Sequence, residues 1–227
     1  MTGVLGLVRR YRGIAEAGAL AVVALAFCAA VGFSNPLPSR GVGTDRLGPD
    51  SGELVQEYIS RAERSLVEDA DSVPRWSLVS FDSAVSPQLA FDAIGGTRIA
   101  QVVLRVPIDR VQTPVVTVGV PGTEESVLQA QDLAATRLHG TTGQWDRQAR
   151  IDAASATSLA AGCDCVVGLV VRGSVGRLRS VVNHPVVRAV EVLPADAIGG
   201  RFAVRALLPE YSDVVGPLPD DGDVPPR

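Results

Sequence analysis

The chain has no lysine: all 21 of its basic residues are arginine, and its 25 acidic residues leave a formal net charge of −4. The arginines are scattered along the sequence. A nucleic-acid partner would need clustered positive charge to displace counterions from phosphate groups. The sequence is therefore not expected to bind nucleic acid.

Histidine and the usual catalytic signatures are also scarce. There are two histidines, His139 and His184, far apart in the sequence, and neither has the neighbouring ligands that a metal site needs. No G-x-S-x-G elbow and no H-E-x-x-H helix is present. The glycine-containing turn at 119–125 resembles a phosphate-binding turn, but Glu124 and Glu125 would repel phosphate and no lysine follows. We therefore expect no catalytic residues, no cofactor and no metal.

One long apolar run is present near the start of the chain. Residues 17–33 carry no charge, and arginines precede them at positions 9, 10 and 12. A helix of about 20 residues, here residues 14–33, would cross roughly 30 Å of hydrocarbon. The arginines favour a cytoplasmic N-terminus. We predict a single-pass signal-anchor protein of the cell membrane, with a cytoplasmic arm at 1–13 and its bulk extracytoplasmic.

A cleaved signal peptide is the alternative for this segment, because Cys28-Ala29-Ala30 offers small residues to a peptidase. The apolar run is longer than the roughly 7 to 15 residues of a typical signal-peptide core, which favours the anchor. Both interpretations place the remaining residues outside the cytoplasm.

Composition divides the outer part into three segments. Residues 34–49 are rich in proline and glycine and are predicted to be a linker, whereas residues 50–208 have the apolar periodicity of a folded α+β domain. Residues 209–227 are rich in proline and aspartate and are predicted to be a disordered tail.

The domain is expected to begin with an amphipathic helix. Asp50-Ser-Gly-Glu53 has the spacing of a capping box, and apolar residues follow it at helical intervals. We expect that helix to pack on the domain through its apolar stripe.

Two β-α-β units then follow. In the first, strand 76–81 leads to a helix that starts at Ser86-Pro87 and is closed by Gly95-Gly96, before strand 99–106. The second comprises strand 165–172, helix 174–183 and strand 186–193, and between the units lie strand 115–120 and two helices at about 123–140 and 144–161. This pattern predicts a ferredoxin-like α+β domain, an antiparallel sheet covered on one face with the helical pair inserted between its halves.

The peptide DAIGG occurs twice, at residues 92–96 and 196–200. The first copy would close the helix inside the first unit, and the second would follow the last strand of the second unit. Because the two contexts differ, we interpret both copies as turns and not as a shared ligand loop.

Cys163-Asp164-Cys165 is the most specific local feature. Two cysteines outside the membrane predict a disulfide, because export compartments favour oxidation, and Cys28 lies within the predicted span. Plain buried thiols are the simpler alternative. A ring closed across one residue would be tight and easier to reduce, which would suit a redox switch, but the C-x-x-C arrangement at a helix start is missing.

The order LVSF, Ser-Pro helix, VVLRVP, LAAGCDCVVGLVVRG and LRSVVNHPVVRAVEVLP, between about residues 76 and 195, resembles a family of uncharacterised single-pass membrane proteins of high-GC Gram-positive bacteria. Residues 159–173 carry the most specific part of the resemblance. It implies the architecture and an envelope location, and it implies no activity.

The leading functional hypothesis is a membrane-anchored extracytoplasmic module that binds or scaffolds a protein partner in the cell envelope and performs no catalysis. The exposed sheet face or the helical pair would supply the contact surface. The alternative is an extracytoplasmic thiol-disulfide protein that uses Cys163 and Cys165. A ligand sensor is disfavoured, because a short N-terminal arm leaves no room for a signalling domain.

Overall fold

The computed structural model describes residues 22, 45–67, 73–139 and 146–225. In chain order, the elements are β1 (Arg46–Leu47), α2 (Val55–Ser65), β2 (Arg75–Val85), α3 (Pro87–Ala93), β3 (Arg98–Leu104), β4 (Val116–Gly119), α4 (Glu124–Leu128), α5 (Ala130–His139), α6 (Arg147–Ala161), β5 (Val166–Gly173), α7 (Val175–Val182), β6 (Val187–Val192) and β7 (Ala203–Val204). All of them belong to the compact unit Gly43–Arg227.

The predicted arm at 1–13 lies outside the described residues, as does the predicted span at 14–33 apart from Val22. Among the described residues, no helix has both the length and the apolar character needed to cross a bilayer.

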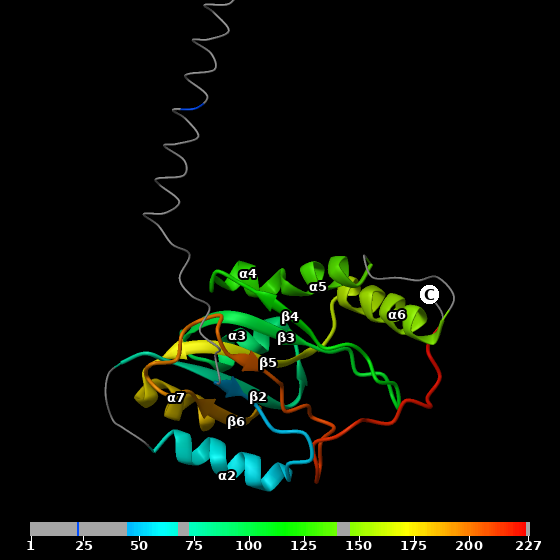
Figure 1. The fold of residues 1–227 in the computed structure, drawn as a ribbon. Coiled ribbons are helices and arrows are strands. Elements are labelled where there is room, and N and C mark those ends of the chain that lie inside the picture. Colours follow the sequence, from blue (N-terminus) through cyan, green and yellow to red (C-terminus); the bar gives the residue numbers. More distant parts are fainter. Residues whose placement is uncertain (1–21, 23–44, 68–72, 140–145, 226–227) are drawn as a thin grey trace, which may run out of the picture. The chain divides into compact units, whose positions relative to one another are not determined.

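Five strands form one antiparallel sheet in the order β4-β3-β5-β2-β6 (Figure 1). The units β2-α3-β3 and β5-α7-β6 interleave, because β5 lies between the strands of the first unit and β2 between those of the second. The fifth strand, β4, extends the sheet beyond β3. The predicted α+β class and antiparallel sheet are confirmed.

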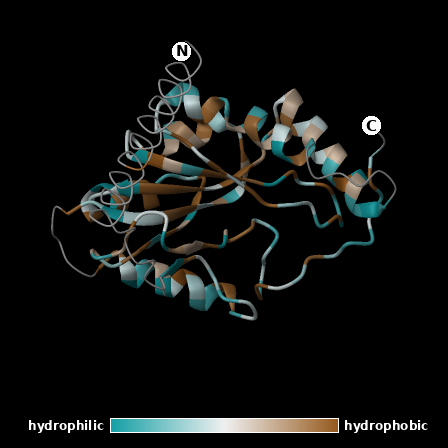
Figure 2. Cartoon of the chain, turned by 45° about the horizontal axis from the view of Figure 1, so that its top comes forward, coloured by the Kyte–Doolittle hydropathy of each residue, from teal (hydrophilic) through white to brown (hydrophobic). Residues whose placement is uncertain are grey.

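Side chains alternate across the sheet, as the two-residue period of a strand requires. Val79 and Phe81 on β2 point into the larger core, whereas Leu78 packs on the opposite face. The larger core is closed by apolar residues of α3, α4, α5, α6 and α7, and in Figure 2 the strands are predominantly hydrophobic. One face of the sheet is thus covered by helices.

The opposite face is also covered, which corrects the prediction of a sheet covered on one side only. Tyr58 of α2 packs with Leu207 and Val215 of the C-terminal segment, and Leu47 packs on Leu78. Strand β1 pairs in parallel with β7 over this face. Residues 45–49 of the predicted linker 34–49 therefore belong to the folded domain, because Leu47 is buried in the second core.

Local signals set most element ends. Ser86 accepts a hydrogen bond from the Leu89 amide at 3.2 Å, and Pro87 is the first residue of α3, as predicted. The capping box at Asp50–Glu53 is displaced: α2 begins at Val55 without a side-chain cap, and the Glu53 carboxylate accepts the Asp50 amide at 2.7 Å in the preceding turn.

Residues 209–225 of the C-terminal segment are packed and hydrogen-bonded to the domain, which corrects the prediction of a disordered tail at 209–227 for these residues. A β-bridge joins Val214 to Leu54, and the Val215 side chain is 1% exposed. The Arg188 guanidinium donates to the carbonyl oxygens of Leu208 at 3.1 Å and Tyr211 at 2.6 Å. Composition predicted disorder here because local sequence does not reveal these partners.

The two DAIGG copies are both turns but have different roles. Gly95 and Gly96 have φ values of 54° and 78° and end α3. In the second copy, a Cβ on Gly199 would lie 2.5 Å from the Trp76 ring, so glycine allows that close approach. The interpretation as separate turns is supported.

Candidate functional site

The cysteine pair lies between α6 and β5. Cys163 and Cys165 are joined by a disulfide with their Cα atoms 5.3 Å apart. The chain enters this loop through Gly162, whose φ of 79° ends α6. Cys165 is fully buried in the larger core, while Cys163 is partly exposed and Asp164 is exposed.

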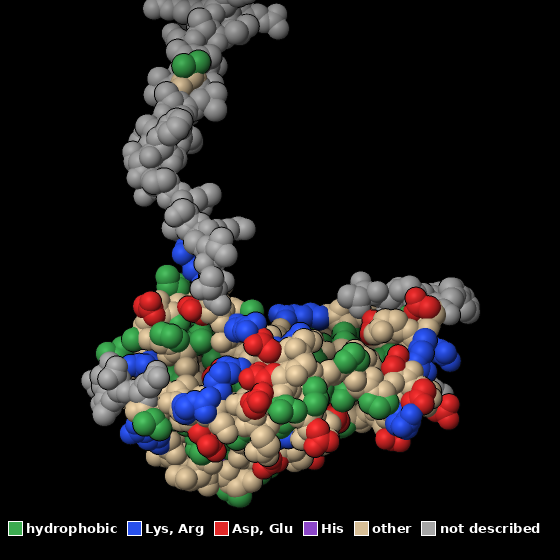
Figure 3. Space-filling model, turned by 60° about the horizontal axis from the view of Figure 1, so that its bottom comes forward, with side chains coloured by type: hydrophobic (Ala, Val, Ile, Leu, Met, Phe, Trp, Pro, Cys, Tyr) green, Lys and Arg blue, Asp and Glu red, His purple; other side chains and the backbone are tan. Residues whose placement is uncertain are grey.

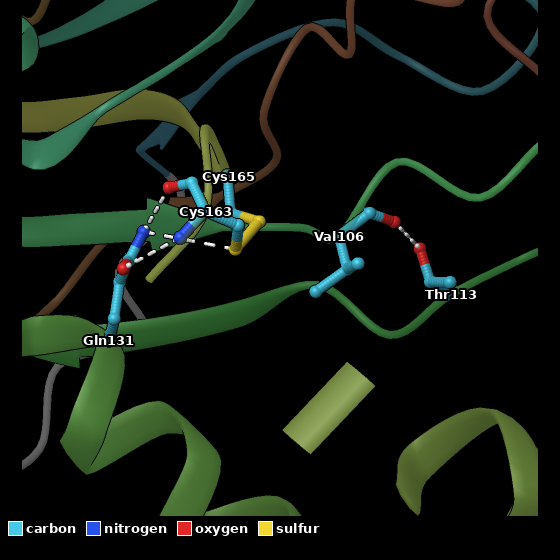
Figure 4. The surroundings of a disulfide bond; sticks show 5 residues. All are labelled: Val106, Thr113, Gln131, Cys163 and Cys165. Carbon is cyan, nitrogen blue, oxygen red and sulfur yellow. Dashed lines mark hydrogen bonds between the residues drawn. A yellow bond between two sulfur atoms is a disulfide. The ribbon is translucent and has the colours of Figure 1, made fainter. Parts of the chain in front are cut away.

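The side chain of Gln131 holds this loop against α5 (Figure 4). Its Nε2 donates to the Cys163 carbonyl oxygen at 2.5 Å, and its Oε1 accepts the Cys163 amide at 3.2 Å. Gln131 is itself buried, so each polar atom of its amide needs a protein partner. The disulfide and the amide clamp together fix the start of β5.

This geometry favours a structural role for the disulfide. An attacking thiolate would reach Cys163, the more exposed sulfur, and Cys165 would then be the leaving group. The departing thiolate would be left in an apolar core, where desolvation penalises the charged form.

A buried ionic network lies on the second face of the sheet. Glu191 of β6 accepts hydrogen bonds from the Gly48 amide at 2.5 Å and from the Tyr58 hydroxyl at 3.3 Å, and it pairs with Arg61. Arg61 also pairs with Glu53 at 3.0 Å and lies over the Tyr58 ring. The network joins β6, α2 and the first residues of the domain.

The pKa values of the two carboxyl groups of the network are shifted in opposite directions. Burial raises the pKa of Glu191, and the bonds from Gly48, Arg61 and Tyr58 offset only part of this effect. Burial also acts to raise the pKa of Glu53, but the bonds from Arg61 and the Asp50 amide outweigh it and lower that pKa. Both carboxyl groups hold segments of the same domain together.

Charges also hold the acidic end of the C-terminal segment. Asp220 pairs with Arg147 at 3.1 Å, Asp221 pairs with Arg110, and the Gly222 amide donates to the Arg110 carbonyl at 2.8 Å. The Arg110 bonds lower the pKa of Asp221. On the face carrying α2, basic and acidic side chains are mixed (Figure 3).

The two outer strands of the sheet differ in how their edges are covered. Helix α2 packs against β6, and the Ser65 hydroxyl accepts the outward Val192 amide at 2.9 Å. No strand in the described part of the chain pairs with the outer edge of β4. At that edge the Thr117 carbonyl accepts a hydrogen bond from Arg137 of α5 at 2.6 Å.

A cleft of about 460 Å³ lies beside β4, on the second face of the sheet. It is bounded by Val115 and Thr117 of the β4 segment, by Val103 of β3, and by residues 204–208 and 215–217 of the C-terminal segment. Arg205 is the one charged residue among those that line it.

The structure joins the predicted cysteines and separates the histidines. His139 Nδ1 lies 2.8 Å from the Ala135 carbonyl at the end of α5, whereas His184 lies in the turn after α7. In the described residues, no group of three or more Cys, His, Asp or Glu side chains could hold a metal ion.

Sequence reasoning missed the Glu191 network and the cleft. Glu191 stands between two valines near the end of strand 187–192, and this was a usable signal, since a buried glutamate needs a partner. The cleft had no such signal, because its walls come from segments about 100 residues apart.

No protein-family model matches this chain, and neither the curated proteins nor the solved structures contain a match.

Proposed function

We propose that this protein is a non-catalytic binding module of the bacterial cell envelope, anchored by residues 14–33 and displaying residues 45–225 on the outer side to hold a partner protein. The observation that carries the proposal is the outer edge of β4, which pairs with no strand of the described residues and lies beside the 460 Å³ cleft, in a domain with apolar clusters on both faces of the sheet.

Three features support the location. The uncharged run 17–33 behind three arginines has the length and flanking charge of a span with a cytoplasmic N-terminus. The Cys163–Cys165 disulfide is typical of an oxidising compartment. The resemblance to single-pass envelope proteins of high-GC Gram-positive bacteria points the same way.

The fold supports a display scaffold. The interleaved units, with the order β3-β5-β2-β6, support a ferredoxin-like sandwich in which α5 and α6 would be the inserted helical pair. The ionic groups described above join the domain's own segments, so they supply stability instead of an acid and base pair. Contact surface remains on the helical layer, where Leu128 and Leu133 are exposed, and at the β4 edge.

The test uses the full chain in native membranes. Reporter fusions at the C-terminus should be active only when the reporter requires export, and proximity labelling from that end should enrich an envelope protein over a matched anchor-only control. A C-terminal reporter active only in the cytosol would overturn the location. Enrichment equal to the anchor-only control would overturn the binding function.

The alternative function is thiol-disulfide exchange at Cys163 and Cys165. The exposed Asp164 between them leaves Cys163 accessible, which favours it, while the buried Cys165 opposes it. Insulin reduction by the protein, together with its reduction potential, separates the two: an inert protein of very low potential has a structural disulfide.

A further inference from the structure

The outer edge of β4 presents backbone groups in a defined order. Val120 donates to the Ala100 carbonyl at 2.9 Å, and Val118 lies opposite Val102. In an antiparallel ladder alternate residues bond to the same neighbour, so the amides and carbonyls of Thr117 and Gly119 point away from β3. Both residues are exposed. The Arg137 side chain donates a hydrogen bond to the Thr117 carbonyl, and an added strand would replace Arg137 there.

Prolines limit the length of this edge. Pro114 and Pro121 bracket the segment, and proline has no amide to give to an added strand. Short edges with proline and a charged side chain resist open-ended aggregation. The edge is therefore suited to a short extended segment of about five residues.

The cleft beside β4 sets the side-chain chemistry of that segment. Alternate residues of an added strand would face the same side as Val115 and Thr117, which line the cleft. The walls there are mainly apolar, and the Arg205 guanidinium has no ion pair among the described residues. A carboxylate would complement Arg205, and an apolar side chain would fill the remaining space.

We propose that β4 binds the partner protein by strand addition, with an extended segment that places an apolar side chain in the cleft and an aspartate or glutamate on Arg205. This inference rests on the proposed binding function and names its mode. A second copy of this chain fits less well, because residues 114–121 contain no acidic residue to pair with Arg205 if β4 paired with β4.

The experiment is site-specific photo-crosslinking of the full chain in native membranes. A benzoylphenylalanine replaces Gly119, where a Cβ atom would meet no other part of the protein within 4 Å. A second protein carries the same group in place of Leu133, on the exposed side of α5. Mass spectrometry identifies the crosslinked peptide.

We expect position 119 to crosslink an extended segment of a different protein with an acidic residue within a few positions. Arg205→Glu should lower the yield about tenfold and Arg205→Lys much less, because the contact is ionic. Thr117→Pro removes only an outward amide and should also lower the yield, whereas its matched control Thr117→Val should not. Thermal unfolding of each variant identifies any that misfold. If Thr117→Pro misfolds, the crosslinking yield of Arg205→Glu decides whether the proposal stands.

Four results would overturn this proposal. A crosslink between two copies of this chain would make the edge a self-interface, and a yield unaffected by Arg205→Glu would remove the acidic residue from the contact. A crosslink at position 133 alone would move the partner to the helical pair and leave the proposed function standing. The absence of crosslinks at both positions would count against the proposed function as well.

Discussion

Removing the Arg61 side chain should lower the free energy of unfolding, because the buried carboxylates around it lose their cation. The Glu191 and Glu53 side chains are 6% and 14% exposed, so Arg61→Ala would leave two poorly hydrated charges without their cation. Breaking a buried ion pair costs about 3 to 5 kcal/mol. The Arg61 side chain is 37% exposed, so water can replace part of its contribution, and we expect a loss of about 2 kcal/mol.

The assay is thermal and urea unfolding of the fragment 43–227 at pH 7. A loss of about 2 kcal/mol corresponds to a fall of about 6 °C in Tm for a domain of this size. Arg64→Ala is the matched control, since Arg64 is on the same helix, is exposed and makes no side-chain contact with the described residues of the network. Adding Glu191→Gln to Arg61→Ala should restore about 1 kcal/mol. Equal losses for Arg61→Ala and Arg64→Ala would refute this account of the network.

The same network gives a pH dependence with a definite sign. The pKa of Glu191 is raised on folding, so its contribution to stability is fully present below the unfolded pKa of about 4.3 and is lost as the pH rises through the folded value. Glu53 contributes in the opposite direction, because its pKa is lowered. Glu191→Gln removes only the first effect, so its stability relative to the wild type should improve between about pH 4 and pH 7 in urea unfolding.

Three further outcomes are expected. Gly222→Ala would place a Cβ 2.3 Å from a backbone oxygen of the loop before β4, and should release the acidic end of the chain to limited proteolysis; Gly216→Ala, with nothing within 4 Å, should not. Ser86→Ala should cost about 1 kcal/mol in urea unfolding through loss of the α3 cap. Replacing Cys163 and Cys165 together by serine should cost about 1.5 kcal/mol in the same assay, because the ring that the disulfide closes is short.

The strands and helices of the two β-α-β units could be predicted from sequence because their signals are local. Ser86-Pro87 starts α3 and Gly95-Gly96 ends it, and both sit between runs of β-branched residues. The second unit repeats this order. Each signal acts within a few residues, so a single sequence was enough to place the elements of these two units and the α+β class, whereas it missed β1 and β7 and joined α4 and α5 into one helix.

The second face of the sheet required long-range information. Strand 187–192 gives no sign that Glu191 meets Arg61, 130 residues away in the sequence. In the same way, the composition of residues 219–223 indicates disorder until the arginines at positions 110 and 147 are placed beside it. Local composition measures what a segment can bury by itself, whereas these residues find their partners elsewhere in the chain.

The accessibility of the β4 edge, on which the proposed function depends, also could not be predicted from local sequence. The run Val-Val-Thr-Val-Gly-Val at 115–120 predicts a strand, and its flanking prolines favour an edge position. Whether that edge is open depends on where β3, α5 and the C-terminal segment lie. The ordered C-terminal segment forms one wall of the cleft beside β4. A chain whose last residues were disordered would lack that wall, and with it the apolar surface that Tyr211, Val215 and Pro217 add to the cleft.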